Sequence, residues 1–184
     1  MKLTGEKILP LPQEQVWSAL NDPDVLQQSI PGCESFETLS DHSYQATVAT
    51  KIGPVQARFN GTVNITDADA PNGYTLSGQG SGGTAGSAKG SAKVRLESVE
   101  GGTRLTWDAD AQISGKLAQI GSRLVESSAN MMANQFFSRF EQILAGETPE
   151  AEPLVVSAFL PSWLRIAAWV GLLLLIILIY FLTR

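Results

Sequence analysis

The stretch HSYQATVATKIGPVQARFNGTVNI, residues 42–65, decides the fold class. Apolar and polar side chains alternate on both sides of Gly53-Pro54, a pair that is typical of a turn. The alternating apolar positions are Tyr44, Ala46, Val48, Ile52, Val55, Ala57, Phe59, Val63 and Ile65. A period of two predicts a pair of antiparallel strands with one buried face and one solvated face.

The same alternation extends away from this hairpin in both directions. Residues 1–9 are compatible with a first strand, and a further strand begins at Tyr74. Two later segments alternate at Ala92, Val94 and Leu96, and then at Leu105, Trp107, Ala109, Ala111 and Ile113. The chain therefore contains a run of antiparallel strands.

Helical patterns flank these strands. Residues 13–20 place Val16, Trp17 and Leu20 on one helical face, and Asp22 can cap a second short helix that starts at Pro23. A long helix is expected from residue 116 to residue 145, ending before Gly146. The simplest packing of this order is an α+β fold, in which a curved antiparallel sheet wraps around the long C-terminal helix.

The C-terminal tail has a different character. Residues 166–183, IAAWVGLLLLIILIYFLT, carry no charge, and as a helix they would cover roughly 27 Å. We therefore expect a folded domain at residues 1–145, an acidic, proline-containing linker at 146–163 and a single transmembrane helix at 164–184. The N-terminus lacks a secretory signal, so the expected location is the inner (cell) membrane, with the domain on its cytoplasmic side.

Composition excludes several classes of function. Hydrophobic residues make up 43% of the chain and charged residues 17%, which is typical of a globular protein. The net charge of −5 disfavours nucleic-acid binding. Cys33 and His42 are the only cysteine and the only histidine, so neither a disulfide within the chain nor a structural zinc site is expected.

No catalytic constellation is visible in the sequence. His42 is interpreted as an exposed turn residue, Cys33 as a semi-buried thiol, and Asp108 and Asp110 as solvated carboxylates on the polar side of their strand. Residues 78–83 match G-x-G-x-x-G, but a strand follows them rather than the helix that a dinucleotide site requires. The glycine-rich stretch at 78–93 is either a flexible hairpin connection or a mobile loop at a cavity mouth or partner surface.

Four segments together resemble a known family. These are VWSALNDPDVLQQSIPGCESFE at 16–37, IGPVQARFNGTVNI at 52–65, GSAKGSAKVRLE at 86–97 and GTRLTWDADAQISGKLAQIGSRL at 102–124. Together they resemble the carbon monoxide dehydrogenase G-subunit family, a branch of the START-like (SRPBCC) helix-grip superfamily of lipid- and hydrophobic-ligand-binding domains. The resemblance implies a cavity between sheet and long helix, and a role beside the aerobic, molybdenum-containing dehydrogenase.

Residue size points to the same region. Small residues gather in the last two predicted strands and in the first half of the long helix, so these elements either approach closely or leave a void. We expect a void that holds an apolar ligand, lined by Phe59, Trp107, Ala109, Leu117, Gly121, Leu124, Ser128 and Met131. Ser128, Gln135 and Tyr44 could donate hydrogen bonds to the ligand.

Two functions fit these expectations. In the first, the domain carries a respiratory quinone (menaquinone or ubiquinone) between the membrane and the dehydrogenase, with no tightly bound cofactor and no enzymatic activity of its own. In the second, the chain is a ligand-free adaptor that recruits the dehydrogenase to the membrane or helps to assemble it. The expected partners are the dehydrogenase, the lipid bilayer and, in the first case, the quinone.

Overall fold

Seven antiparallel strands form a single sheet in the computed structural model, which describes residues 1–146. The strand order across the sheet is β1-β7-β6-β5-β4-β3-β2. Strands β2 to β6 each pair with the next strand in the sequence, and β1 pairs with β7. The strands are β1 Lys2–Leu9, β2 Cys33–Ser40, β3 Ser43–Ile52, β4 Val55–Asp69, β5 Gly73–Ser81, β6 Ser87–Val99 and β7 Gly102–Ile113.

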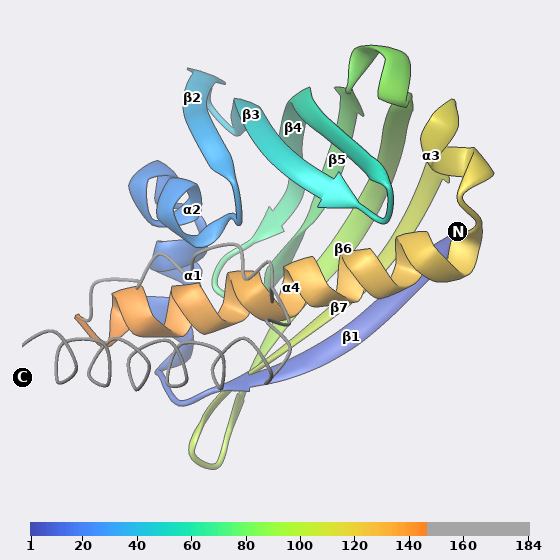
Figure 1. Cartoon of the computed structure of the whole chain (residues 1–184). Helices are drawn as coiled ribbons and strands as arrows, with labels where there is room; N and C mark the ends of the chain where they lie inside the picture. Colours follow the sequence, from blue (N-terminus) through green and yellow to red (C-terminus); the bar gives the residue numbers. More distant parts are fainter. Residues whose placement is uncertain (147–184) are drawn as a thin grey trace, which may run out of the picture. The chain divides into compact units, whose positions relative to one another are not determined.

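Helices occupy one side of this curved sheet. Helix α4 (Ser122–Leu144) runs across the sheet, and α1 (Gln13–Leu20) and α2 (Pro23–Ser29) lie beside its C-terminal end (Figure 1). Asp22 caps α2 as predicted, because its Oδ1 accepts hydrogen bonds from the backbone N–H groups of Asp24 at 2.9 Å and Val25 at 3.3 Å. The α+β class and the sheet gripping a C-terminal helix are therefore confirmed.

The long helix is interrupted at Gly121. The prediction of one continuous helix over residues 116–145 is wrong, because a short helix α3 (Lys116–Gln119) precedes α4. Gly121 joins them with φ of +90°, a left-handed value that breaks the helix and that residues with a Cβ rarely adopt. The apolar periodicity continues across Gly121, so the sequence pattern alone does not indicate the break between α3 and α4.

The glycine-rich stretch at 78–93 is mostly strand, so the prediction that all of it forms a hairpin connection or loop is wrong. Strand β5 continues to Ser81 and β6 begins at Ser87, leaving only a 3₁₀ turn, η1 (Gly83–Ala85), as the connection. A Cβ added to Gly90 would collide with the carbonyl oxygen of Asp110 on the neighbouring strand. Glycine thus permits the close approach of strands that a strongly curved sheet needs.

The hydrophobic core is concentrated at one end of the domain. The side chains of Leu9, Val16 and Phe140 have no exposed surface, and they share a cluster with Leu20, Leu96, Leu105 and Phe137. This cluster joins α1, the C-terminal half of α4 and the nearby ends of the strands. The core therefore fills the space beneath the second half of α4.

Most of the predicted linker and all of the predicted membrane segment, residues 147–184, lie outside the described residues. Among residues 1–146, no helix is both long enough and apolar enough to cross a membrane. The transmembrane helix at 164–184 stays a prediction.

Candidate functional site

Two contacts identify the sheet face that is turned toward α4, which we call the inner face. The rings of Trp107 on β7 and Phe137 on α4 lie 5.2 Å apart between centroids. On the other side of the helix, Thr50 Oγ1 on β3 lies 3.8 Å from Met132 Sδ. Successive side chains of a strand point to opposite faces of the sheet. Every second side chain, in register with Trp107 on β7 and Thr50 on β3, therefore points toward α4.

A band of very small side chains crosses the middle of the inner face. We call it the small-residue band, and its members come from five adjacent strands: Ala46, Gly61, Gly78, Gly80, Ala88, Gly90, Ala92, Ala109 and Ala111. The strand register makes it continuous, since Ala92 pairs with Ala109, Gly78 with Gly90, and Gly61 with both Ala46 and Gly80. No member of the band carries a polar or ionisable side chain.

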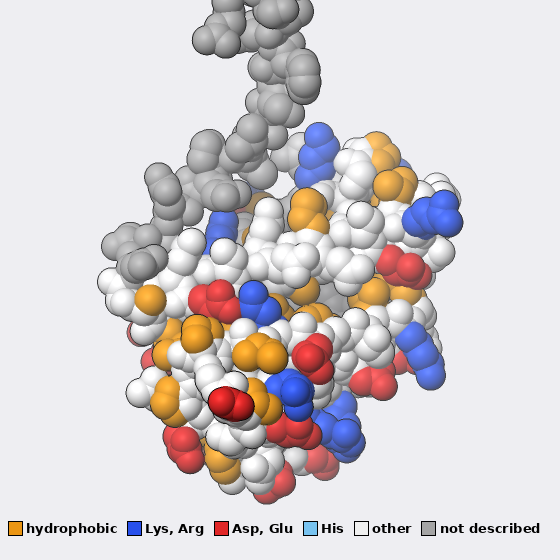
Figure 2. Space-filling model, turned by 90° about the horizontal axis from the view of Figure 1, so that it is seen from below, with side chains coloured by type: hydrophobic (Ala, Val, Ile, Leu, Met, Phe, Trp, Pro, Cys, Tyr) orange, Lys and Arg blue, Asp and Glu red, His pale blue; other side chains and the backbone are white. Residues whose placement is uncertain are grey.

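The band is only partly covered although it faces a helix. Its members are half-buried, apart from the exposed Gly90, whereas Leu96 and Leu105, on the same face of β6 and β7, are only 2% and 3% exposed. Part of this exposure is on the outer face, because the glycines and Ala88 of the band also line the hollows there. The backbone of α4 lies mainly near α2, β1 and β3 and has few neighbours on the central strands. Figure 2 shows a hollow in the domain with hydrophobic side chains along its rim. The backbone of α4 therefore has little direct contact with the central strands, and the band carries no large side chain that would fill the interval between them.

Two turns close the interval between α4 and the band at the end that lies away from the core. A methyl group placed on Gly53, in the β3–β4 turn, would lie 3.8 Å from Ile120 Cδ1 and 3.9 Å from Leu124 Cδ1. At the η1 turn, Ala85 is buried and the backbone of Gly86 packs directly against that of Gly115. These two turns form the wall between the strand tips and the α3–α4 junction.

The structure separates the predicted ligand-lining residues into three groups. Phe59, Trp107 and Ala109 lie on the inner face, and Leu117 is buried in α3. Ser128 is half-buried on α4, whereas Gly121 has open space around it at the helix start. Leu124 and Met131 are 49% and 51% exposed.

The exposure of these two helix residues follows from helix phase. Leu124 precedes the buried Val125 by one position, which turns it about 100° around the axis. The part of α4 that faces the sheet carries Val125, Ala129 and Met132 instead, and the sequence analysis did not select them. The sequence pattern identifies the sheet-facing side of α4 only if the helix is known to begin at residue 122.

A comparison with known families decides the affiliation of this domain. The family model that describes the G subunit of carbon monoxide dehydrogenase (CoxG) matches residues 5–145. The chain belongs to this family. Membership associates the CoxG domain with carbon monoxide dehydrogenase, in agreement with the resemblance of the four sequence segments. No curated protein matches the chain.

Solved structures confirm the fold of the CoxG domain. A conserved protein from Geobacillus kaustophilus is 29% identical, with a TM-score of 0.76 over 79% of this chain and 96% of that one. An uncharacterized protein from Rhizobium leguminosarum is 17% identical, with a TM-score of 0.61 over 80% and 95%. A protein from Rhodobacter sphaeroides is 18% identical, with a TM-score of 0.59 over 79% and 92%. The last two similarities concern the fold alone.

The titratable side chains singled out in the sequence lie on β2, in the β2–β3 turn and on β7. Burial raises the pKa of the Cys33 thiol, which disfavours the thiolate that a nucleophile would need. His42 is exposed in the β2–β3 turn, and Asp108 and Asp110 are exposed on the sheet face opposite α4. Within residues 1–146 no group of three His, Cys, Asp or Glu side chains could hold a metal ion.

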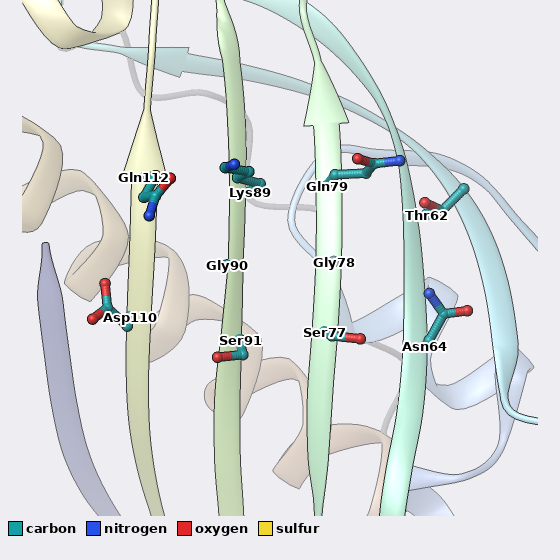
Figure 3. A pocket seen from close by; sticks show the side chains of 10 residues that line it. All are labelled: Thr62, Asn64, Ser77, Gly78, Gln79, Lys89, Gly90, Ser91, Asp110 and Gln112. Atoms are coloured by element: carbon teal, nitrogen blue, oxygen red, sulfur yellow. The ribbon is translucent and has the colours of Figure 1, made fainter.

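The outer face of the sheet, turned away from α4, carries polar hollows. The larger one, of about 610 Å³, is shown in Figure 3. Its lining side chains form two cross-strand rows, Asn64-Ser77-Ser91-Asp110 and Thr62-Gln79-Lys89-Gln112. A second hollow, of about 410 Å³, continues it toward Asn60 and Ser87. Both hollows are open, and every strand that borders them contributes polar side chains, so they enclose an apolar ligand poorly and we take the inner face as the candidate ligand site.

The wall at the η1 turn gives a testable prediction. Gly86 has φ of +118°, and a Cβ there would collide with the carbonyl oxygen of Ser114. We expect Gly86→Ala to destabilise the domain by about 2 kcal/mol or more, because steric overlap adds to backbone strain. Gly83→Ala is the matched control: Gly83 also has positive φ, but no atom lies within 4 Å of an added Cβ. Equal losses of stability in thermal melting would contradict the close packing of Gly86 against the Ser114-Gly115 segment.

Proposed function

We propose that this chain is an accessory protein of the aerobic, molybdenum-containing carbon monoxide dehydrogenase. It binds a respiratory quinone on its inner face and delivers it to the enzyme, which couples carbon monoxide oxidation to the respiratory chain. The observation that carries the proposal is the small-residue band, an apolar surface that faces α4 and is only partly covered.

Packing energetics favour a ligand above the band. Protein interiors are close-packed, and leaving apolar surface uncovered forgoes about 25 cal/mol for each Å² that a ligand could bury. The band offers no charge and no side-chain hydrogen-bonding group, so the molecule that covers it is largely hydrocarbon or aromatic. Aromatic side chains border the space at Phe59 and Trp107, where a flat ring can pack.

The family and the apolar C-terminal run both point to the membrane as the source of the ligand. A dehydrogenase that oxidises carbon monoxide must pass electrons onward, and quinones are electron acceptors that dissolve in membranes. The apolar run at 166–183 would tether the domain at the bilayer where such molecules reside. Menaquinone and ubiquinone both have the required chemistry, a flat ring with carbonyl groups and an apolar chain.

The competing function is a ligand-free adaptor that recruits the dehydrogenase to the membrane. An adaptor has no need of an open interior, and side chains would be expected to fill the space below α4. The partly covered band therefore favours the carrier.

Mass spectrometry of organic extracts tests the proposal. The full-length chain is purified natively from membranes and extracted, and we expect a quinone in an amount comparable to that of the protein. The Ala109→Leu variant described below, purified in parallel, controls for quinone that merely accompanies the membrane fraction. Equal quinone in both extracts, together with no binding of added quinone by the wild type, would leave the adaptor as the function.

A further inference from the structure

Two buried phenols stand at the border between the filled core and the small-residue band. Tyr44 on β3 and Tyr74 on β5 both point to the inner face, and they are only 8% and 6% exposed. Each ring is held by an aromatic neighbour. Phe36 stacks on Tyr44 at 5.2 Å between centroids, and Trp17 packs at a tilt on Tyr74 at 5.6 Å. These contacts fix the rings in place.

The hydroxyl groups of these rings lack partners within the described part of the chain. Neither one makes a hydrogen bond to another residue of 1–146. The only unpaired side-chain polar atom there that is fully shielded from solvent is Arg104 Nε, so both tyrosine hydroxyls retain some accessible surface. A tyrosine hydroxyl on a buried ring normally finds a hydrogen-bond partner. Two unpaired hydroxyls on buried rings therefore indicate that the partner is a molecule from outside this part of the chain.

The register places both rings next to the band. Tyr44 pairs with Val63, and the next inner-face residue on its strand is Ala46 of the band. Tyr74 pairs with Val94, and the next residue of β6 on the same face is Ala92 of the band. The two phenols thus mark the core-side end of the space, opposite the wall formed by the β3–β4 and η1 turns.

The Tyr74 hydroxyl is suited to donating a hydrogen bond. Burial raises the pKa of Tyr74 far above its ordinary value, and the neighbouring Tyr44 adds to this effect. Tyr74 therefore stays neutral at any physiological pH and keeps its proton for donation.

We propose that Tyr44 and Tyr74 form the polar end of the ligand site and donate hydrogen bonds to a carbonyl oxygen of the bound molecule. This inference rests on the proposed function and adds the orientation of the ligand to it. The carbonyl-bearing ring lies at the core-side end of the small-residue band, and the apolar chain extends from it along the band. The pair selects carbonyl-bearing ligands over hydrocarbons of the same shape.

Binding of two matched probes tests this role. Menadione carries a carbonyl oxygen on each side of its ring, and 2-methylnaphthalene has nearly the same shape without them. The full-length chain, delipidated in detergent, is titrated with each probe by calorimetry. We expect Tyr44→Phe and Tyr74→Phe each to weaken menadione binding about three- to tenfold, with a larger loss in the double variant and no change for 2-methylnaphthalene. Phenylalanine keeps the ring packing, so the melting temperature should stay close to that of the wild type.

The remaining outcomes distinguish a failure of the proposed tyrosine role from a failure of the proposed carrier function. Ser91→Ala is the control variant, because Ser91 is exposed on the outer face of β6, turned away from α4, and it should bind menadione as the wild type does. Unchanged menadione binding in the double phenylalanine variant would overturn the role of the tyrosines but leave the carrier intact. A wild type that binds neither probe would overturn the carrier itself. Infrared spectra of bound menadione give a measurement free of mutations, since a carbonyl stretch at its unbonded frequency would also refute the hydrogen bonds.

Discussion

Replacing Ala109 with leucine should remove most of the ligand binding and leave the fold intact. Ala109 lies in the small-residue band, where it pairs with Ala92 on β6 and Leu3 on β1. In a close-packed core such an enlargement typically costs 1–3 kcal/mol, whereas open space above the band should keep the cost below about 1 kcal/mol. The added isobutyl group occupies the place of the ligand ring. We expect quinone affinity to fall at least about tenfold, which corresponds to about 1.4 kcal/mol.

The control for this variant is Gln112→Leu, which places leucine on the same strand but on the outer face. Gln112 is exposed and lines a polar hollow, so its replacement should change neither quinone binding nor the melting temperature by much. Two measurements suffice, thermal melting and quinone reduction by the purified dehydrogenase with membranes and each variant. A large stability loss in Ala109→Leu with unchanged quinone reduction would show that the band is closely packed and empty of ligand.

Enlarging Gly121 is a less suitable test than the sequence suggested. Small size at this position is compatible with a ligand cavity, but the structure gives a different reason for it. Gly121 has φ of +90° at the break between α3 and α4, and no atom lies within 4 Å of an added Cβ. A phenylalanine there would strain the backbone, so a loss of binding or stability could not be assigned to filled space.

The sheet was predictable because its signal is local. Alternation along β3, β4 and β7 reports directly which residues face the helix, and Phe59, Trp107 and Ala109 lie there as expected. The resemblance of the four segments also led to the correct family. By contrast, β2 was missed, because CESFETLS lacks regular alternation and is held in place by its pairing with β3.

The interior of the site was harder to predict because it depends on register and helix phase. Gly61, Gly78 and Gly80 become one surface only when β4 and β5 are aligned, and the sequence alone placed Gly78 and Gly80 in an apparent loop. Likewise, Leu124 and Met131 fit an apolar stripe in the sequence, but the break at Gly121 decides which side of α4 meets the sheet. The tyrosine pair joins strands that are not adjacent, so only the folded chain brings Tyr74 near Tyr44.

The division of the interior into a filled end and an open end predicts an uneven distribution of stability along α4. Phe140 has no exposed surface, stacks on Phe136 with 5.7 Å between ring centroids, and shares the core cluster with Leu9 and Val16. Phe140→Ala should therefore destabilise the domain by about 3–5 kcal/mol, the usual cost of removing a fully buried phenylalanine side chain. For a domain of this size the melting temperature should fall by roughly 10 °C.

Met131→Ala is the comparison, since this side chain lies on the same helix but is 51% exposed. Its loss should cost less than about 1 kcal/mol, because little apolar surface leaves the core. Urea unfolding of the wild type and both variants gives the two free energies on one scale. Unequal losses follow if α4 is anchored to the core by buried side chains of its C-terminal half. Equal losses would contradict the concentration of the core beneath that half.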